Sequence, residues 1–293
     1  VRASRASIEC LQSRDVLIAT KQYTEAMVTP MVLASTLGRR AYTKPLGYAG
    51  DYQVMLYMYE DSFEGESAYG RVIHRCYTAD HPMCRGIRTR KDLIVEWMEE
   101  EHRRIQSDHN EPTTFRVVGL GCGPAREVTD FVARNRTWPG NVIWTLIDQE
   151  EEALSVAYRE SRAEIAKWGS AGHLHLLNLS FVQMLSEGIP LQTAGSQHFI
   201  YSAGLFDYLR ESRAQILVRA LYDLLAQDGL LLVGNLVAPN EVFWGAEFLM
   251  DWTLLYRTRQ EMLGLTALLP DSAEVELTQE PTGAYHFLRI RKH

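Results

Sequence analysis

The chain has 293 residues, of which 46% are hydrophobic and 23% charged, and this composition is typical of an ordinary globular protein. The formal net charge of -7 provides no broad basic surface for counterion-driven binding, so we expect no nucleic-acid substrate. The four cysteines lie far apart without CxxC pairs, which predicts reduced thiols and neither a disulfide framework nor a metal site.

No uninterrupted apolar run approaches the roughly eighteen residues that a membrane-spanning helix needs. The opening segment VRASRASIECLQSRD lacks the apolar centre of a signal peptide. We therefore expect a cytoplasmic protein without a membrane span. The sequence leaves open whether the chain forms a homodimer.

The first third of the chain has a helical pattern from Ser7 to about Ile105. Residues recur three or four positions apart at Val16, Thr20, Tyr23, Met27 and Met31, as expected for one face of a helix. The segment KPLGYAGDY, Lys44 to Tyr52, interrupts this pattern with proline and glycine and predicts a loop between two helices. A polar stretch from Gln106 to Thr114 predicts a linker, so we expect a helical cap at residues 1–108 and a second domain at residues 109–293.

After this linker, short apolar runs alternate with helical stretches, which is typical of an α/β fold with a mainly parallel sheet. The expected strands are Phe115–Leu120, Val142–Asp148, Leu174–Leu179, His198–Ala203 and Leu230–Leu236. A helix is expected from about Asn240 to Leu263, with Trp244, Phe248, Trp252 and Tyr256 on one packed face. Glu274–Glu280 and Ala284–Ile290, separated by a Pro-Thr-Gly turn, predict an antiparallel hairpin at the sheet edge and bring the sheet to seven strands.

A glycine-rich loop follows the first expected strand in VVGLGCGPAREV, Val117 to Val128. Gly119, Gly121 and Gly123 allow the backbone to approach a ligand closely, and Pro124 suits the first position of the helix that we expect next. The dinucleotide pattern GxGxxG would require glycine at Pro124 or Arg126, and no GK[ST] follows for a P-loop. The remaining pattern, GxGxG, resembles the first motif of class I methyltransferases, in which this loop wraps the methionine part of S-adenosylmethionine (SAM).

Asp148 ends the second strand, 25 residues after Gly123, where a ribose-binding carboxylate is expected in a nucleotide-binding fold. Its oxygens could accept charge-assisted hydrogen bonds from both ribose hydroxyls. Gln149 is then expected beside the adenine, while Asn178 could read the adenine edge and Leu179 could pack on its face. Two positions depart from the general motif, because Gly119 stands where an acidic residue is common and Ala125 where a further glycine is common.

A closer resemblance rests on KPLGYAGDYQVM (Lys44–Met55), GCGPAREV (Gly121–Val128), YSAGLFDYL (Tyr201–Leu209) and GNL (Gly234–Leu236). From about Arg39 to Arg289 the chain resembles the bacterial methyltransferase family of extracellular-factor 3-hydroxypalmitic acid methyl ester biosynthesis. The resemblance implies a Rossmann-like class I methyltransferase domain beneath a helical N-terminal cap. It also implies SAM as cofactor and carboxyl O-methylation of a hydroxy fatty acid.

Ligands of this fold bind beyond the carboxyl ends of the strands, so the segment after the fourth strand should face the transferred methyl group. Tyr201 and Asp207 are therefore candidate catalytic residues and Ser202 a candidate cofactor contact, although Asp207 could equally brace a helix start. In the loop at Lys44–Tyr52, Asp51 is a third catalytic candidate, and Tyr48 and Tyr52 could close over the cofactor.

Several alternatives remain open at this point. A carboxylate acceptor needs no general base, whereas a hydroxyl or amine acceptor would make Asp51, Asp207 or His198 useful as one. Lys44, Arg39 and Arg257 could pair with an acidic substrate or simply be surface charges. The alternative functions are O- or N-methylation of an aromatic or natural-product acceptor, and a SAM-binding regulatory module without turnover.

Overall fold

The computed structural model describes residues 14–108, 113–136, 138, 140–169, 171–180, 182–183, 196–238 and 244–293. The chain divides into two compact units. The first consists of Val1–Arg88 and Pro239–Leu254, and the second of Thr89–Ala238 and Leu255–His293. The predicted division at residue 108, into a helical cap and a second domain, stays a prediction.

The first unit is helical, as predicted. Its described helices are α2 (Arg14–Met27), α3 (Thr29–Val32), α4 (Thr36–Thr43), α5 (Tyr52–Glu60), α6 (Ala68–Arg75), the π-helical turns η1 (Cys76–Asp80) and η4 (Gly245–Leu249), and the start of α7 (Pro82–Ser107). Three helices begin where a side chain accepts hydrogen bonds from the first backbone N–H groups, at Ser35, Asp51 and Ser67. These short polar residues satisfy donors that have no partner within the helix.

A shared carboxylate links distant parts of the first unit. Asp251 accepts hydrogen bonds from Lys21 and Lys44, with both Nζ–Oδ distances at 2.6 Å. Lys44 ends α4 in the left-handed conformation, and Asp251 has a positive φ of 48° as well. Thr29 donates to the carbonyl of Leu249 at 3.1 Å. The end of η4 is therefore bound to α3, and the segment after it to α2 and to the end of α4.

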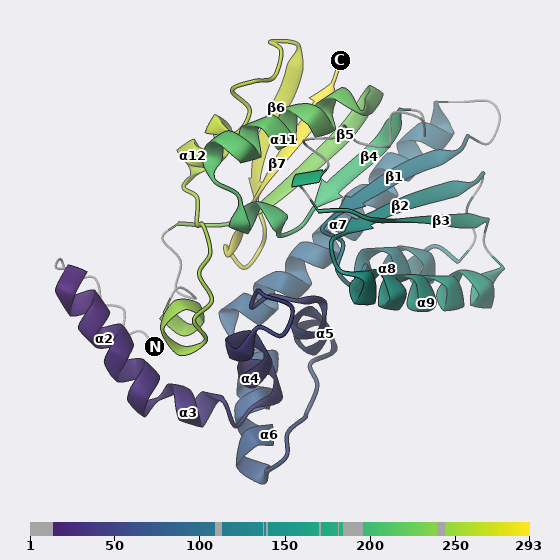
Figure 1. The fold of residues 1–293 in the computed structure, drawn as a ribbon. Helices are drawn as coiled ribbons and strands as arrows, with labels where there is room; N and C mark the ends of the chain where they lie inside the picture. The colour runs from purple at the N-terminus through teal and green to yellow at the C-terminus, as the bar shows by residue number, and fades with distance from the viewer. Residues whose placement is uncertain are drawn as a thin grey trace. The chain divides into compact units, whose positions relative to one another are not determined.

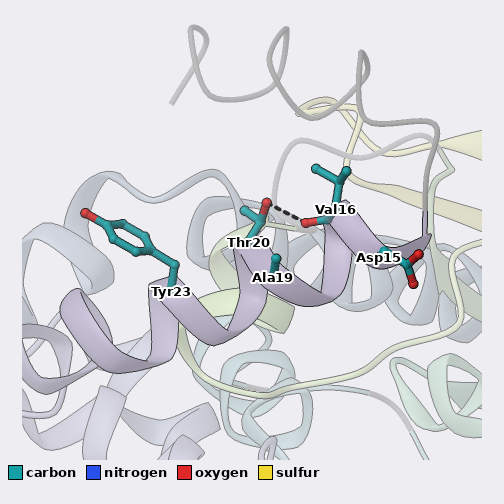
Figure 2. A pocket seen from close by; sticks show the side chains of 5 residues that line it. All are labelled: Asp15, Val16, Ala19, Thr20 and Tyr23. Carbon is teal, nitrogen blue, oxygen red and sulfur yellow. Dashed lines mark hydrogen bonds between the residues drawn. The ribbon is translucent and has the colours of Figure 1, made fainter.

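Helix α2 presents part of its apolar face to solvent. Tyr23 is 66% exposed, Val16 and Met27 of the same helix are exposed too, and so is Met31 in the following helix α3. Figure 2 shows a shallow hollow along this helix, lined by Asp15, Val16, Ala19, Thr20 and Tyr23, with the Thr20 hydroxyl donating to the carbonyl of Val16. The predicted helical pattern is confirmed here, but the hollow brings together no cluster of reactive side chains.

The second unit contains a seven-stranded sheet in the order β3-β2-β1-β4-β5-β7-β6. Its strands are β1 (Phe115–Leu120), β2 (Val142–Asp148), β3 (Gly172–Asn178), β4 (Gln197–Ser202), β5 (Leu225–Leu236), β6 (Ala273–Gln279) and β7 (Tyr285–Lys292). Strands β1 to β5 are parallel, and β7 pairs antiparallel with both β5 and β6. All seven predicted strands and the C-terminal hairpin are confirmed; the largest difference is that β5 begins at Leu225 rather than Leu230.

Side chains alternate between the two faces of this sheet. Helices cover both faces (Figure 1). On one face Val118, Ile147 and Ile200 pack in a core with apolar residues of α11 (Glu211–Asp223) and with Met262 of α12 (Arg259–Gly264). On the other face, aromatic rings from α7 and α8 (Arg126–Arg134) contact the strands. Their ring pairs are Trp97–Phe287, His102–Phe115 and Phe131–Trp144.

The connections between the strands follow the predicted alternation. Helix α8 joins β1 to β2, α9 (Glu151–Trp168) joins β2 to β3, and α11 joins β4 to β5. Most of the helix expected between the third and fourth strands lies outside the described residues. The chain crosses from the edge strand β3 to β4, so the connections leaving β1 and β4 run in opposite directions and open the carboxyl edge between them.

The long helix predicted from Asn240 to Leu263 is wrong over residues 250–258. After η4 the chain has no regular secondary structure until Thr258, apart from an isolated β-bridge at Arg257, and Thr258 then starts α12 with a capping box to Glu261. In this irregular segment the backbone of Arg257 pairs with the end of β5, its N–H donating to Leu236 and its carbonyl accepting from Ala238, both at 2.9 Å. Long-range hydrogen bonds thus replace the helical ones, and Trp252 and Tyr256 do not lie on a helix face.

Two histidines of the first unit, the buried His74 and the partly buried His81, accept hydrogen bonds from backbone N–H groups. Nδ1 of His74 accepts the backbone N–H of Leu37, and Nδ1 of His81 accepts that of Met83. Burial lowers the pKa of His74 and lowers the pKa of His81 to about 4. A histidine whose folded pKa lies below its unfolded value of 6.5 resists protonation, so its full contribution to stability is present above pH 6.5 and is lost as the pH falls toward 4.

We expect the free energy of unfolding of the wild type to fall between pH 6.5 and 4 more steeply than that of His81→Gln, by at most about 3 kcal/mol. Urea unfolding at several pH values measures this difference. His173→Gln, at an exposed position of β3, is the matched control and should follow the wild type. Equal pH dependence for the wild type and His81→Gln would contradict a His81 that stays neutral in the folded protein.

Candidate functional site

The candidate site lies at the carboxyl edge of the sheet, where β1 has β2 on one side and β4 on the other. The parallel register aligns Leu120 with Ile147 and Asp148 with Asn178, so three strand ends reach the same edge. Ligands of open α/β sheets bind at such a reversal of strand order.

The glycine loop after β1 turns through three left-handed residues. Gly121, Gly123 and Ala125 have φ values of 61°, 51° and 49°. The N–H groups of Gly121 and Cys122 both donate to the carbonyl of Ile147, which holds the loop over the end of β2. A Cβ at Gly123 would meet no atom within 4 Å, so open space lies beside the backbone at this position. A side chain at position 123 would project into this open space.

The helix after the loop begins two residues later than predicted. Pro124 is not its first residue, because α8 starts at Arg126 with Ala125 as its N-cap. The N–H of Ala125 donates to the carbonyl of Cys122 at 2.9 Å, which closes a tight turn before the helix. Residues Cys122 to Ala125 are therefore used by the turn rather than by the first helical turn.

Asp148 connects the ends of β1 and β2. Its Oδ2 accepts the N–H of Gly123 at 2.8 Å, and its Oδ1 accepts that of Glu150 at 3.0 Å. Burial raises the pKa of this carboxyl group, while the backbone donors, Gly123 first among them, act to lower it. The carboxylate thus fixes the position of the glycine loop, a role that sequence reasoning did not assign to it.

The end of β3 is hydrogen-bonded to the end of β2. The side-chain amide of Asn178 and the N–H of Leu179 both donate to the carbonyl of Asp148, at 3.2 and 3.0 Å. Gln149 is exposed next to Asp148, and its amide donates to the carboxylate of Glu150 at 3.3 Å. The structure therefore brings Gly121, Gly123, Asp148, Gln149, Asn178 and Leu179 together at adjoining strand ends.

Tyr201 explains why residue 119 is glycine. A Cβ at Gly119 would lie 2.7 Å from the Tyr201 hydroxyl and 2.9 Å from its ring, so the tyrosine occupies the space that a side chain at 119 would need. Tyr201 is buried at the end of β4. The next residue, Ser202, is fully buried, and its hydroxyl has no hydrogen-bond partner among the described residues.

Asp207 is buried in the 3-10 helix η3 (Leu205–Tyr208), just after β4. Its Oδ1 accepts the N–H of Leu236 at 2.7 Å, and its carbonyl accepts that of Leu255 at the same distance. Burial raises the pKa of Asp207 to about 7, with Arg90, the Leu236 N–H and Arg257 opposing the shift. These contacts are those of a brace between η3 and the end of β5. Asp207 does not cap η3, whose N-cap position is Gly204.

Asp51 belongs to the first unit and forms a helix cap. Its Oδ1 accepts the N–H groups of Gln53 and Val54, and both oxygens accept from Nε of Arg40 at 2.8–2.9 Å. The Arg40 guanidinium lies 5.7 Å from the centre of the Tyr52 ring. The loop at residues 44–51 is confirmed as a connection between α4 and α5, while contacts of Tyr48 and Tyr52 with a cofactor stay predictions.

The three basic residues considered for an acidic substrate all have protein partners. Lys44 binds Asp251, and Arg39 pairs with Glu66 at 3.1 Å. Arg257 is buried, and its guanidinium donates to the carbonyl of Phe206 at 2.7 Å and also contacts Asn235 and the carbonyl of Leu209. Arg257 therefore holds η3 in place and is not a surface charge.

Sequence reasoning missed Arg90 and Glu127. Arg90 of α7 donates to the carbonyl of Ala203 at the end of β4, and Glu127 is buried in the first turn of α8. Glu127 stands within the GPARE string, which was a local signal, whereas nothing in the helical pattern around Arg90 singles it out.

In the part of the chain that the structure describes, no group of three or more His, Cys, Asp or Glu residues could hold a metal ion. None of the described helices is long and apolar enough to cross a membrane.

Solved structures share this fold at low sequence identity. A "possible exported protein" from Bordetella parapertussis is 16% identical with a TM-score of 0.60, and the alignment covers 96% of this chain and 99% of that one. Magnesium protoporphyrin IX methyltransferase from Synechocystis PCC 6803, with bound SAM, is 12% identical with a TM-score of 0.51, covering 87% and 95%. A "putative O-methyltransferase" from Nostoc punctiforme PCC 73102 is 13% identical with a TM-score of 0.50, covering 90% and 72%. These likenesses confirm the Rossmann-like fold of class I methyltransferases.

No curated protein matches the sequence. The model of one protein family, described as "Putative methyltransferase", matches residues 21–171, just over half of the chain. This match includes the loop at Lys44–Tyr52, the glycine loop and Asp148. The chain is therefore a member of this methyltransferase family.

Proposed function

We propose that this protein transfers a methyl group from SAM to a small-molecule acceptor. The observation that carries the proposal is the hydrogen bond from the Gly123 N–H to Asp148, beside a loop position with open space. Each Asp148 oxygen accepts one described backbone N–H, and a carboxylate oxygen has a second lone pair that can accept from a ribose hydroxyl. The glycine loop and this carboxylate fit the sulfonium nucleoside.

The other strand-end residues complete this proposed cofactor site. Backbone groups of Gly119, Gly121, Gly123 and Pro124 would border the methionine part of SAM, and Gln149, Asn178 and Leu179 the adenine. Ser202 at the end of β4 has a buried hydroxyl that a ligand could reach by a hydrogen bond. That Tyr48 and Tyr52 contact the cofactor is a further part of the proposal.

When bound, SAM supplies an electrophilic methyl group on a positively charged sulfur. The protein has to hold the acceptor in line with that methyl group, and orientation of this kind can contribute roughly 7–11 kcal/mol to lowering a barrier. Tyr201 packs against Gly119, and Asp207 braces η3 to β5, so both residues shape the segment that would face the acceptor. We propose that they act mainly by positioning this segment.

For the acceptor we propose the carboxyl group of a hydroxy fatty acid. The support is the resemblance of GYAGDY, GPARE and YSAGLFDYL to the methyl ester biosynthesis family. A carboxylate is already ionised at pH 7 and attacks without a general base. This agrees with Asp51 and Asp207, whose carboxylates are bound to backbone N–H groups.

Gly123→Ala tests the cofactor site. Its Cβ would fill the open space beside the loop, so we expect the affinity for S-adenosylhomocysteine to fall by about tenfold or more, ~1.4 kcal/mol. Gly169→Ala is the matched control, because Gly169 has a similar φ of 62°, also meets no atom within 4 Å, and lies at the end of α9. Both variants should lose ~1–2 kcal/mol of stability from the left-handed conformation. Isothermal calorimetry on both variants measures the affinities, and equal affinity in the two would contradict the proposed site.

Turnover with SAM and 3-hydroxypalmitic acid tests the acceptor. We expect release of S-adenosylhomocysteine together with a methyl ester that mass spectrometry detects. Release only with a phenolic or amine acceptor would instead support O- or N-methylation of an aromatic or natural product. Binding of SAM without turnover of any acceptor would indicate a regulatory module.

Asp207→Asn separates a brace from a general base. Asparagine still accepts the Leu236 N–H, so we expect turnover within about threefold of the wild type, whereas loss of a general base would lower kcat by roughly 10²–10⁴. The folded pKa of about 7 lies above the ordinary value of 3.8, so stability is highest while Asp207 is protonated and is lost as it ionises. The stability of the wild type relative to Asp207→Asn should therefore decrease from pH 4 to pH 7, as urea unfolding measures.

A further inference from the structure

Arg90 is a buried cation at the carboxyl edge of the sheet. It lies on α7, is 5% exposed, and its Nη1 donates to the carbonyl of Ala203 at 3.0 Å, just after the end of β4. Its guanidinium carbon is 4.5 Å from the centre of the Tyr285 ring, within the range of a cation–π contact. Tyr285 pairs with Leu236, so this ring belongs to the same edge of the sheet. Arg90 is therefore held on two sides at the edge that carries the glycine loop.

Gly204 makes room for this guanidinium. A Cβ at Gly204 would lie 2.9 Å from Nη1 and 3.3 Å from Nη2 of Arg90, so the guanidinium packs directly on the backbone after β4. The next residue, Leu205, is in turn close to the glycine loop, because its Cβ lies 3.2 Å from a Cβ built on Gly121. A short chain of contacts thus connects Arg90 to the proposed cofactor loop.

Two buried carboxyl groups lie within the electrostatic reach of Arg90. Glu127 is in the first turn of α8, directly after the glycine loop, and Asp207 is in η3. Burial raises the pKa of each to about 7, and Arg90 is among the charges that oppose this rise. The cation therefore acts on both segments that border the loop, where the α8 N-terminus also favours a negative ligand group.

We propose that Arg90 binds the carboxylate of the amino-acid end of SAM. This inference rests on the proposed function. A guanidinium presents two parallel N–H donors that match the two oxygens of a carboxylate, and it keeps its charge when buried. Gly121 and Gly123 would border the same amino-acid end, and Arg90 would add a positive charge that the glycine loop lacks.

The test compares two ligands that differ only in this end. S-adenosylhomocysteine carries the amino-acid group, whereas 5′-methylthioadenosine keeps the adenosine and the thioether and lacks the carboxylate. In Arg90→Met the affinity for S-adenosylhomocysteine should fall about 10- to 100-fold, the loss expected for a hydrogen-bonded charge pair. The affinity for methylthioadenosine should stay within about twofold. Calorimetry on both ligands measures this change in preference.

Three further variants complete the test of the Arg90 contact. Arg90→Gln keeps a donor for the Ala203 carbonyl but loses the charge, and it should show the same change in preference even if Arg90→Met does not fold. Arg90→Lys keeps the charge without the paired donors and should lose about three- to tenfold. Arg289→Met is the matched control, because Arg289 also lies over an aromatic ring, that of Trp97, further along β7; it should leave both affinities unchanged.

The outcomes distinguish failure of the Arg90 contact from failure of the proposed function. Equal weakening of both ligands in the Arg90 variants would mean that Arg90 only supports the fold of the edge, and unchanged affinities would mean that it is not a ligand contact. Either result overturns the inference and leaves the proposed function standing. Failure of the wild type to bind either ligand would overturn the proposed function itself.

Discussion

The hydrogen bond from the Gly123 N–H to the Asp148 carboxylate is the interaction on which the candidate site depends. It joins the loop after β1 to the end of β2, and the same carboxylate also accepts the N–H of Glu150 in the next connection. Because the Asp148 carboxylate is buried, loss of either backbone donor would leave it with fewer hydrogen bonds to stabilise its charge. The left-handed turn at Gly121 and Gly123 is thus hydrogen-bonded to the end of the neighbouring strand.

A second constraint acts on the segment after β4. Two buried arginines that are far apart in sequence donate to its backbone, Arg90 to the carbonyl of Ala203 and Arg257 to that of Phe206. Asp207 adds a third link, to the N–H of Leu236. Burying such charges is favourable only when hydrogen bonds satisfy them, and here the partners are the carbonyl groups of an irregular segment. The edge of the sheet facing the proposed acceptor is therefore rigid, which suits a reaction governed by orientation.

Sequence patterns identified the sheet well and the long-range contacts poorly. Strands β1 and β2 were predicted with their observed ends, because apolar runs bounded by glycine and polar residues are a local signal. The helix predicted through residues 250–258 was wrong, since the four-residue spacing of Trp252 and Tyr256 competes there with the pairing of Arg257 to β5. Arg90 could not be recognised, because its role arises from Ala203, Gly204 and Tyr285, all distant in the chain.

By itself, the sequence determined that an α/β sheet with a C-terminal hairpin forms, that a glycine loop follows its first strand, and that a carboxylate ends its second. These properties depend on periodicity and on residue types within short windows. Only the tertiary structure decided that Asp148 holds the glycine loop, that Tyr201 excludes a side chain at Gly119, and that a guanidinium from α7 lies against Gly204. Each of these contacts joins residues from different strands or helices, and their distances are set by how the elements pack rather than by their spacing along the chain.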